Sequence, residues 1–123
     1  VMLSRQFEAM LNISLDSLTN SSTLLVDNII TAMPPDFKNT MKTYYTSVLN
    51  GLKPGLNCLL IHLAYDNDEM KAVTIDHPQW GAAWRQEDFD FFTSTACRDL
   101  LKKNNIILVT WREIRDKLYR SSK

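Results

Sequence analysis

The feature that most constrains the fold is the short apolar run from Asn57 to Leu63, which reads Asn-Cys-Leu-Leu-Ile-His-Leu. It lies between the turn residues Pro54-Gly55 and a polar segment. A continuous apolar run of this length is typical of a strand that is covered on both faces. Because strands of this kind belong to parallel sheets, the run predicts an α/β fold.

Helical periodicity precedes this run. A helix is expected to begin at Pro35 or Asp36 and to be closed by Asn50-Gly51. Its apolar positions recur with a period of about 3.6 residues. They are Phe37, Met41, Tyr44, Tyr45, Val48, Leu49 and Leu52.

The segments after the run complete an alternating order. A long polar loop is expected from Ala64 to Trp80, followed by a helix that carries Trp80, Trp84, Phe89, Phe91 and Phe92. The remaining expected elements are a helix with Ser94 or Thr93 as N-cap that ends at Asn104-Asn105, a strand over Ile106–Thr110 and a helix over Trp111–Tyr119. This order is typical of a parallel sheet with flanking helices.

The first 33 residues give a mixed pattern. Leu3, Phe7, Met10 and Leu11 have helical spacing, whereas the apolar residues of 24–30 suit either a strand or a loop packed on a core. With 123 residues, the chain is expected to be a single domain or a fragment. A complete (β/α) barrel usually needs roughly 200 residues or more.

Composition argues against several classes of function. The 14 basic and 14 acidic side chains give a net charge of zero, without the basic stripe expected of a nucleic-acid-binding protein. No apolar stretch approaches the ~20 residues of a membrane-spanning helix. The two cysteines, Cys58 and Cys97, have no metal-ligand spacing and are expected to be buried free thiols. They do not fix the cellular location.

His62 is the strongest candidate for chemistry. A histidine at the end of a strand, opening into a polar loop, suits acid–base catalysis or metal ligation. It suits equally a core histidine that is satisfied by backbone hydrogen bonds. The loop carboxylates that follow, of which Asp66 is the nearest, could orient the ring, although an ordinary solvated loop is the more common case.

Aromatic and basic residues after the strand could bind a substrate. Tyr65, Trp80 and Trp84 are candidates for a platform under a sugar ring, but the spacing of the two tryptophans also suits core packing, which we expect for at least one of them. Arg85 precedes Asp88 and Asp90 and could form either a buried ion pair that positions a catalytic group or a weak surface pair.

Three stretches together resemble a known family. They are Leu52–Met70, which contains Leu-Ile-His-Leu-Ala-Tyr-Asp, then Thr74–Ser94, which contains Trp-Arg-Gln-Glu-Asp-Phe, and Asn105–Ile114. The region from about Pro34 to Arg115 is similar to the C-terminal part of the YdjC-like carbohydrate deacetylases, which are relatives of the polysaccharide deacetylases.

The resemblance implies an α/β fold of a particular kind, the C-terminal part of an incomplete (β/α) barrel. It also implies a hydrolase that removes the acetyl group from an acetylated amino sugar. In the family a divalent metal, Mg or Zn, is held by an aspartate and two histidines, and a late histidine protonates the leaving amine. His62 matches that histidine, and Arg85 looks like the arginine that follows the variable loop. The residues expected to bind or orient the substrate are then Tyr65, Asp66, Trp80 and Arg85.

Two departures from the family pattern accompany the resemblance. Leu63 stands where many members have a proline, and the Asp-Asp motif and metal histidines of the family have no match in these residues. We therefore expect the metal ligands to lie in an upstream part of the same chain, and these 123 residues to be inactive alone. Strand edges left open should favour self-association or burial against that upstream part.

Two other functions remain open from the residues alone. One is a small standalone α/β module that binds a sugar or a protein without catalysis. The other is a metal-independent enzyme that uses His62 and Asp66.

Overall fold

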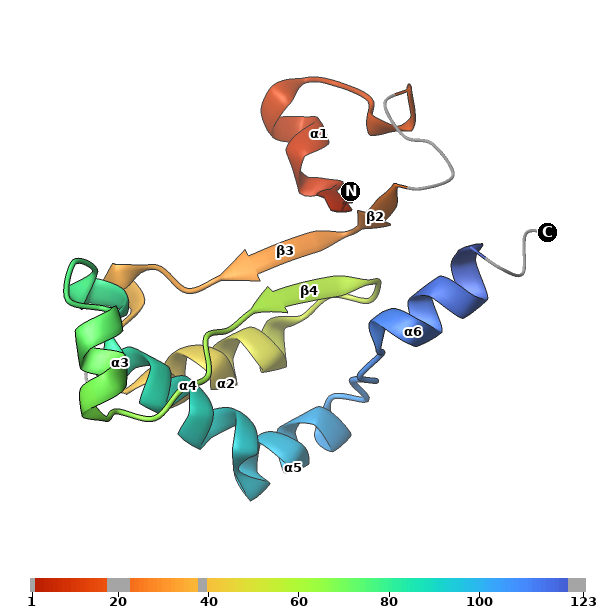
Figure 1. Cartoon of the computed structure of the whole chain (residues 1–123). Helices are drawn as coiled ribbons and strands as arrows, with labels where there is room; N and C mark the ends of the chain where they lie inside the picture. The colour runs from red at the N-terminus through yellow and green to blue at the C-terminus, as the bar shows by residue number, and fades with distance from the viewer. Residues whose placement is uncertain (1, 18–22, 38–39, 120–123) are drawn as a thin grey trace. The chain divides into compact units, whose positions relative to one another are not determined.

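The computed structural model describes residues 2–17, 23–37 and 40–119. They have an α/β fold, in which helices accompany short parallel strands in two small sheets (Figure 1). The chain divides into two compact units, the first formed by residues 1–29, 54–58 and 107–123 and the second by residues 30–53 and 59–106. All the predicted site residues belong to the second unit.

The first unit contains a parallel strand pair. Its elements before residue 28 are β1 (Met2–Ser4), α1 (Gln6–Leu11), a 3-10 turn (Leu15–Ser17) and β2 (Leu24–Val26). Met2 pairs with Leu24, and Ser4 pairs with Val26. The buried Ser4 hydroxyl donates to the carbonyl of Asp27 (3.2 Å). The predicted helix is therefore shorter than expected, because Leu3 belongs to β1.

The second sheet contains the strand predicted from the apolar run. It pairs β3 (Asn28–Thr31) with β4 (Asn57–Leu60), so the strand ends before the predicted boundary at Leu63. The expectation that both faces are covered is wrong, because β4 is only half-buried and Leu60 is 42% exposed. A sheet of two strands does not provide the flanking strands and helices that cover a central parallel strand.

The turn predicted at Pro54-Gly55 is present immediately before β4. Gly55 has a φ of +129°, in the region that side chains rarely adopt. A Cβ at this position would meet the carboxylate of Asp27, whose Oδ2 accepts from the backbone N–H of Leu56 (2.7 Å). Glycine is required at this position for both reasons.

Three helices build the core of the second unit. They are α2 (Met41–Gly51), α4 (Ala82–Thr93) and α5 (Thr95–Lys103), and each packs on the other two (Figure 1). Helix α2 begins later than predicted, because Pro34–Asp36 form a separate 3-10 turn and Thr40 is the N-cap. The buried residues at the centre are Ala32, Met41, Tyr45, Leu49, Trp84, Phe91 and Cys97. The predicted cap of α5 is confirmed, since the Ser94 side chain accepts from the backbone N–H of Cys97.

Two predictions about the segments around these helices are wrong. The expected structureless loop 64–80 contains α3 (Asp68–Val73) and a 3-10 turn (Pro78–Trp80). The Asn67 side chain caps α3 by accepting from the backbone N–H of Met70. The expected strand Ile106–Thr110 has no regular secondary structure and pairs with no strand among the described residues.

The lack of a strand at 106–110 has a physical reason. An apolar, β-branched run has a high strand propensity, but a strand forms only where a neighbouring strand pairs with it. Ile107 is 83% exposed, and Leu108 and Val109 are exposed as well. The segment leads into α6 (Trp111–Ile114), which continues as a π-helical turn (Arg115–Tyr119), so the predicted final helix is confirmed.

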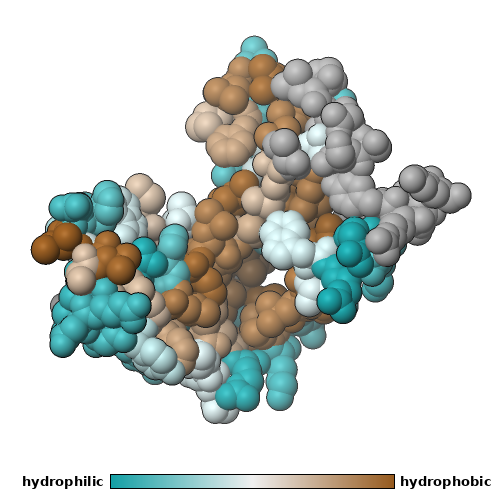
Figure 2. All heavy atoms as spheres, viewed as in Figure 1, coloured by the Kyte–Doolittle hydropathy of each residue, from teal (hydrophilic) through white to brown (hydrophobic). Residues whose placement is uncertain are grey.

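Other apolar side chains are also exposed. Met10, Leu11 and Ile13 lie at the end of α1, where Figure 2 shows hydrophobic residues at the surface. Val73 and Ile75 are exposed at the end of α3 in the second unit. No helix within the described residues combines the length and apolarity needed to cross a membrane.

The two cysteines are both free, and we expect them to differ in reactivity. Cys97 is 2% exposed, and burial raises the pKa of its thiol, whereas Cys58 is only half-buried. Because the thiolate is the reactive form, a thiol reagent should modify Cys58 first and Cys97 only after unfolding. Titration of the native and denatured protein with such a reagent, using Cys58→Ser as the control, tests this. Equal rates in the native protein would contradict the buried position of Cys97.

Candidate functional site

The side chain of His62 lies outside the core. The residue follows β4 by two positions, and its side chain is exposed. The interpretation of His62 as a core histidine is therefore wrong. Its imidazole is accessible to a ligand, and its backbone makes the contact that holds it in place.

A buried carboxylate provides that contact. Asp88 of α4 is completely buried, and its Oδ2 accepts from the backbone N–H of His62 (2.9 Å). Its Oδ1 accepts from the hydroxyl of Tyr45 of α2, which is also completely buried (2.6 Å). Both oxygens are thus satisfied inside the core, as a buried carboxylate requires. The chain leaving β4 is tied through Asp88 to two helices.

Helix α4 also holds the residues that follow His62. The backbone N–H of Ala64 donates to the carbonyl of Arg85 (3.2 Å), and that of Asp66 donates to Oε1 of Gln86 (2.8 Å). The Tyr65 ring lies 4.6 Å from the ring of Phe89, between centroids, and is 60% exposed. Residues 62–66 therefore form a segment fastened along one face of α4, which we call the exit segment.

Arg85 does not form the predicted ion pair with Asp88 or Asp90. The carboxylate of Asp88 is occupied by Tyr45 and His62, and Asp90 accepts from Gln86 (2.8 Å). The Arg85 guanidinium donates instead through Nε to the carbonyl of Trp80 (3.2 Å), which ties the start of α4 to the turn before it.

The tryptophans have different environments. Trp84 is 2% exposed and stacks on Phe37, with 5.3 Å between ring centroids. The prediction that at least one of the two tryptophans packs in the core is therefore confirmed, and Trp84 cannot serve as a sugar platform. Trp80 is half-buried beside it, at 6.4 Å between centroids, and packs against the core. Among the aromatic candidates, Tyr65 is the most exposed and lies nearest to His62 in the chain.

The acidic residues after His62 are mostly exposed to solvent. Asp66 forms an ion pair with Lys71 (3.3 Å), and pairs this exposed contribute little to stability. Asp68 and Glu69 lie in the first turn of α3, where negative charges interact favourably with the helix dipole. Within the described residues, no three His, Cys, Asp or Glu side chains are grouped so that they could hold a metal ion.

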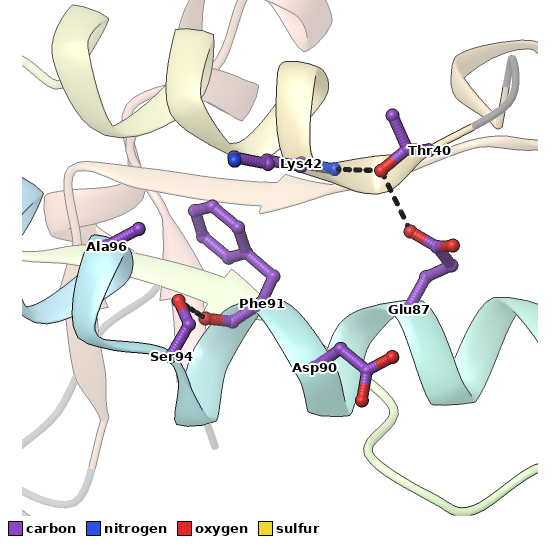
Figure 3. Close-up of a pocket in the computed structure, with 7 residues that line it drawn as sticks. All are labelled: Thr40, Lys42, Glu87, Asp90, Phe91, Ser94 and Ala96. Carbon is purple, nitrogen blue, oxygen red and sulfur yellow. Dashed lines mark hydrogen bonds between the residues drawn. The ribbon is translucent and has the colours of Figure 1, made fainter.

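A pocket of about 180 Å³ lies on another face of α4 (Figure 3). It is lined by Thr40, Lys42, Glu87, Asp90, Phe91, Ser94 and Ala96. Glu87 accepts there from the Thr40 hydroxyl (2.9 Å) and from the backbone N–H of Met41 (3.3 Å), so it caps the start of α2. At 100° per residue, the lining positions of α4 lie roughly opposite Arg85 and Phe89. The pocket includes none of the predicted site residues.

Sequence reasoning missed Tyr45 and Asp88 as site residues. Tyr45 was recognised only as a core position, and Asp88 only as a possible partner of Arg85. A signal for Asp88 exists, because it lies four residues after Trp84 and three before Phe91, on the apolar stripe of the helix. An acidic residue on such a stripe must find hydrogen-bond donors inside the core.

We expect the Tyr45–Asp88 contact to make stability sensitive to alkaline pH. Burial, and then the hydrogen bond to Asp88, raise the pKa of Tyr45 above its ordinary value of 10.0. Below pH 10 the tyrosine is protonated in both states and its contribution is fully present. Between pH 10 and the raised pKa of the folded state, the unfolded state ionises first, so the free energy of unfolding falls there by up to about 1.4 kcal/mol per pH unit for this group.

Comparison with a Tyr45→Phe variant isolates this effect, because Tyr44 and Cys97 also have raised pKa values. Urea unfolding at several pH values above 10 should show a smaller loss of stability in the variant. Equal losses in the two proteins would mean that Tyr45 ionises as readily in the folded state as in the unfolded state.

Comparison with known proteins adds no family assignment. No protein-family model matches the chain, and no curated protein matches it at a significant level. The family resemblance is therefore an inference from the residues alone.

Proposed function

We propose that the chain is the C-terminal portion of a metal-dependent carbohydrate deacetylase of the YdjC-like type, with His62 as the general acid. The observation that carries the proposal is the exposed imidazole just beyond β4, on a backbone anchored by the buried Asp88. This arrangement presents a proton donor to a ligand while its main chain is held in place. The reaction class, removal of an acetyl group from an amino sugar, is inferred from the three stretches of sequence that resemble this family.

In this proposal the residues of the exit segment have distinct roles. Water adds to the carbonyl carbon of the acetamide, and its oxygen stays in the acetate. His62 donates a proton to the nitrogen of the departing amino sugar as the C–N bond breaks, so that a neutral amine leaves. The exposed ring of Tyr65, backed by Phe89, offers an apolar face to the sugar. Arg85 and Trp80 stabilise the turn that precedes α4.

The divalent metal of such an enzyme does not fit the described residues, which bring no ligand set together. Its ligands would come from an upstream part of the same chain, completing an incomplete (β/α) barrel. The exposed apolar segment 107–109 supports this view, because it would pair with a further strand. The same exposure would otherwise favour self-association.

The test of this function is release of acetate from N-acetylglucosamine oligomers by the intact protein with added Mg²⁺ or Zn²⁺. We expect release by the intact protein and none by residues 1–123 alone. If the intact protein binds the oligomers but releases no acetate, the chain is a sugar-binding module and the deacetylase proposal is wrong. Release that persists after exhaustive removal of metal would favour an enzyme that uses His62 and Asp66 alone.

A further inference from the structure

We infer that Asp88 and Tyr45 are positioning residues for the catalytic histidine, an inference that rests on the proposed function. Within the described residues, no hydrogen bond holds the imidazole ring of His62, and the residue is exposed. The region that the ring can reach is therefore set by the backbone that carries it. That backbone is anchored at His62 itself by Asp88, and at Ala64 by the carbonyl of Arg85.

The hydrogen bond that Asp88 accepts from the His62 N–H is well placed to fix the backbone. Asp88 is completely buried, so water cannot compete for its oxygens, and its other oxygen is held by the equally buried Tyr45 at 2.6 Å. Tyr45 lies at the middle of α2, where its ring also packs against Phe91 and Phe92. The backbone of His62 is thus held in place by two packed helices, α2 and α4.

A buried aspartate is not needed merely to fill this space. Apolar residues at both positions, Asp88→Leu together with Tyr45→Phe, would fill it without burying a polar side chain. Retaining a carboxylate there makes sense if its task is to hold the N–H of His62. Small displacements of a reacting group cost up to about 100-fold in rate, so such a fixed point has a direct effect on catalysis.

The test uses the intact protein and three substitutions. Asp88→Leu removes both acceptors, and we expect kcat for acetate release to fall about 10- to 100-fold while KM changes less than about threefold. Asp88→Asn should retain most of the activity, because its amide oxygen can accept from His62 while its NH₂ donates to the Tyr45 hydroxyl. Tyr45→Phe keeps the bond to His62 but frees one oxygen of Asp88, so its loss should be smaller, and it serves as the test if Asp88→Leu does not fold.

A background of His62→Ala separates positioning from a structural role. If Asp88 acts through His62, then Asp88→Leu should change the residual rate of the His62→Ala enzyme by no more than about twofold. A reduction equal to that in the wild-type background would overturn the inference and make Asp88 purely structural.

The same data separate failure of the inference from failure of the proposed function. If His62→Ala lowers kcat but folded Asp88→Leu and Tyr45→Phe enzymes keep full activity, only the positioning role is wrong. If His62→Ala leaves acetate release unchanged, or if the intact protein releases none, the proposed function fails and the positioning role falls with it.

Discussion

Replacing His62 with alanine in the intact protein is expected to lower kcat for acetate release by about 10²- to 10⁴-fold, the usual contribution of a general acid. The free energy of unfolding should change by no more than about 0.5 kcal/mol, because the imidazole is exposed. The hydrogen bond to Asp88 uses the backbone N–H of His62, which alanine retains.

His77 provides a matched control for this substitution. It is the other histidine of the chain, it is also exposed, and it lies at the turn before Pro78. His77→Ala should leave kcat near the wild-type value. Equal losses in the two variants, or a His62→Ala enzyme that loses activity only because it unfolds, would contradict the assigned role.

Replacing Asp88 with leucine is expected to lower the free energy of unfolding by about 2–6 kcal/mol. The reason is that two donors, the Tyr45 hydroxyl and the His62 N–H, lose their acceptor, at about 1–3 kcal/mol each. Asp88→Asn should cost less, about 1 kcal/mol, because its amide oxygen can still accept from His62 and its NH₂ can donate to the Tyr45 hydroxyl oxygen. Urea unfolding followed by circular dichroism measures these differences.

Asp90 supplies the control for the Asp88 series. It lies on the same helix but is exposed, and its carboxylate accepts a surface hydrogen bond from Gln86. Asp90→Leu should therefore change stability by no more than about 0.5 kcal/mol. A similar cost at both positions would mean that the buried bonds of Asp88 contribute nothing specific.

Much of the second unit could be predicted from local sequence patterns. The spacing of Met41, Tyr45 and Leu49 places all three on the buried face of α2, as the structure confirms. The Ser94 cap and the helix after it follow from chemistry within a single turn. Apolar spacing and capping depend on residues that are close together in the chain, so they can be recognised from the sequence alone.

The predictions that failed depend on contacts between distant segments. The run 106–110 has strand propensity, but whether it becomes a strand depends on a partner that no local pattern specifies. The partner of Asp88 was likewise expected on its own helix, at Arg85. In the structure its partners are instead Tyr45 and His62, which are 43 and 26 positions away in the sequence.

The most direct test of the account is a crystal structure of the intact protein with an N-acetylated amino sugar bound. We predict an imidazole nitrogen of His62 within about 3.2 Å of the sugar amide nitrogen, the reach that proton donation requires. The backbone N–H of His62 should still be bonded to Asp88. A sugar bound elsewhere, or a His62 ring directed away from it, would contradict the central claim that this histidine is held in place to protonate the leaving amine.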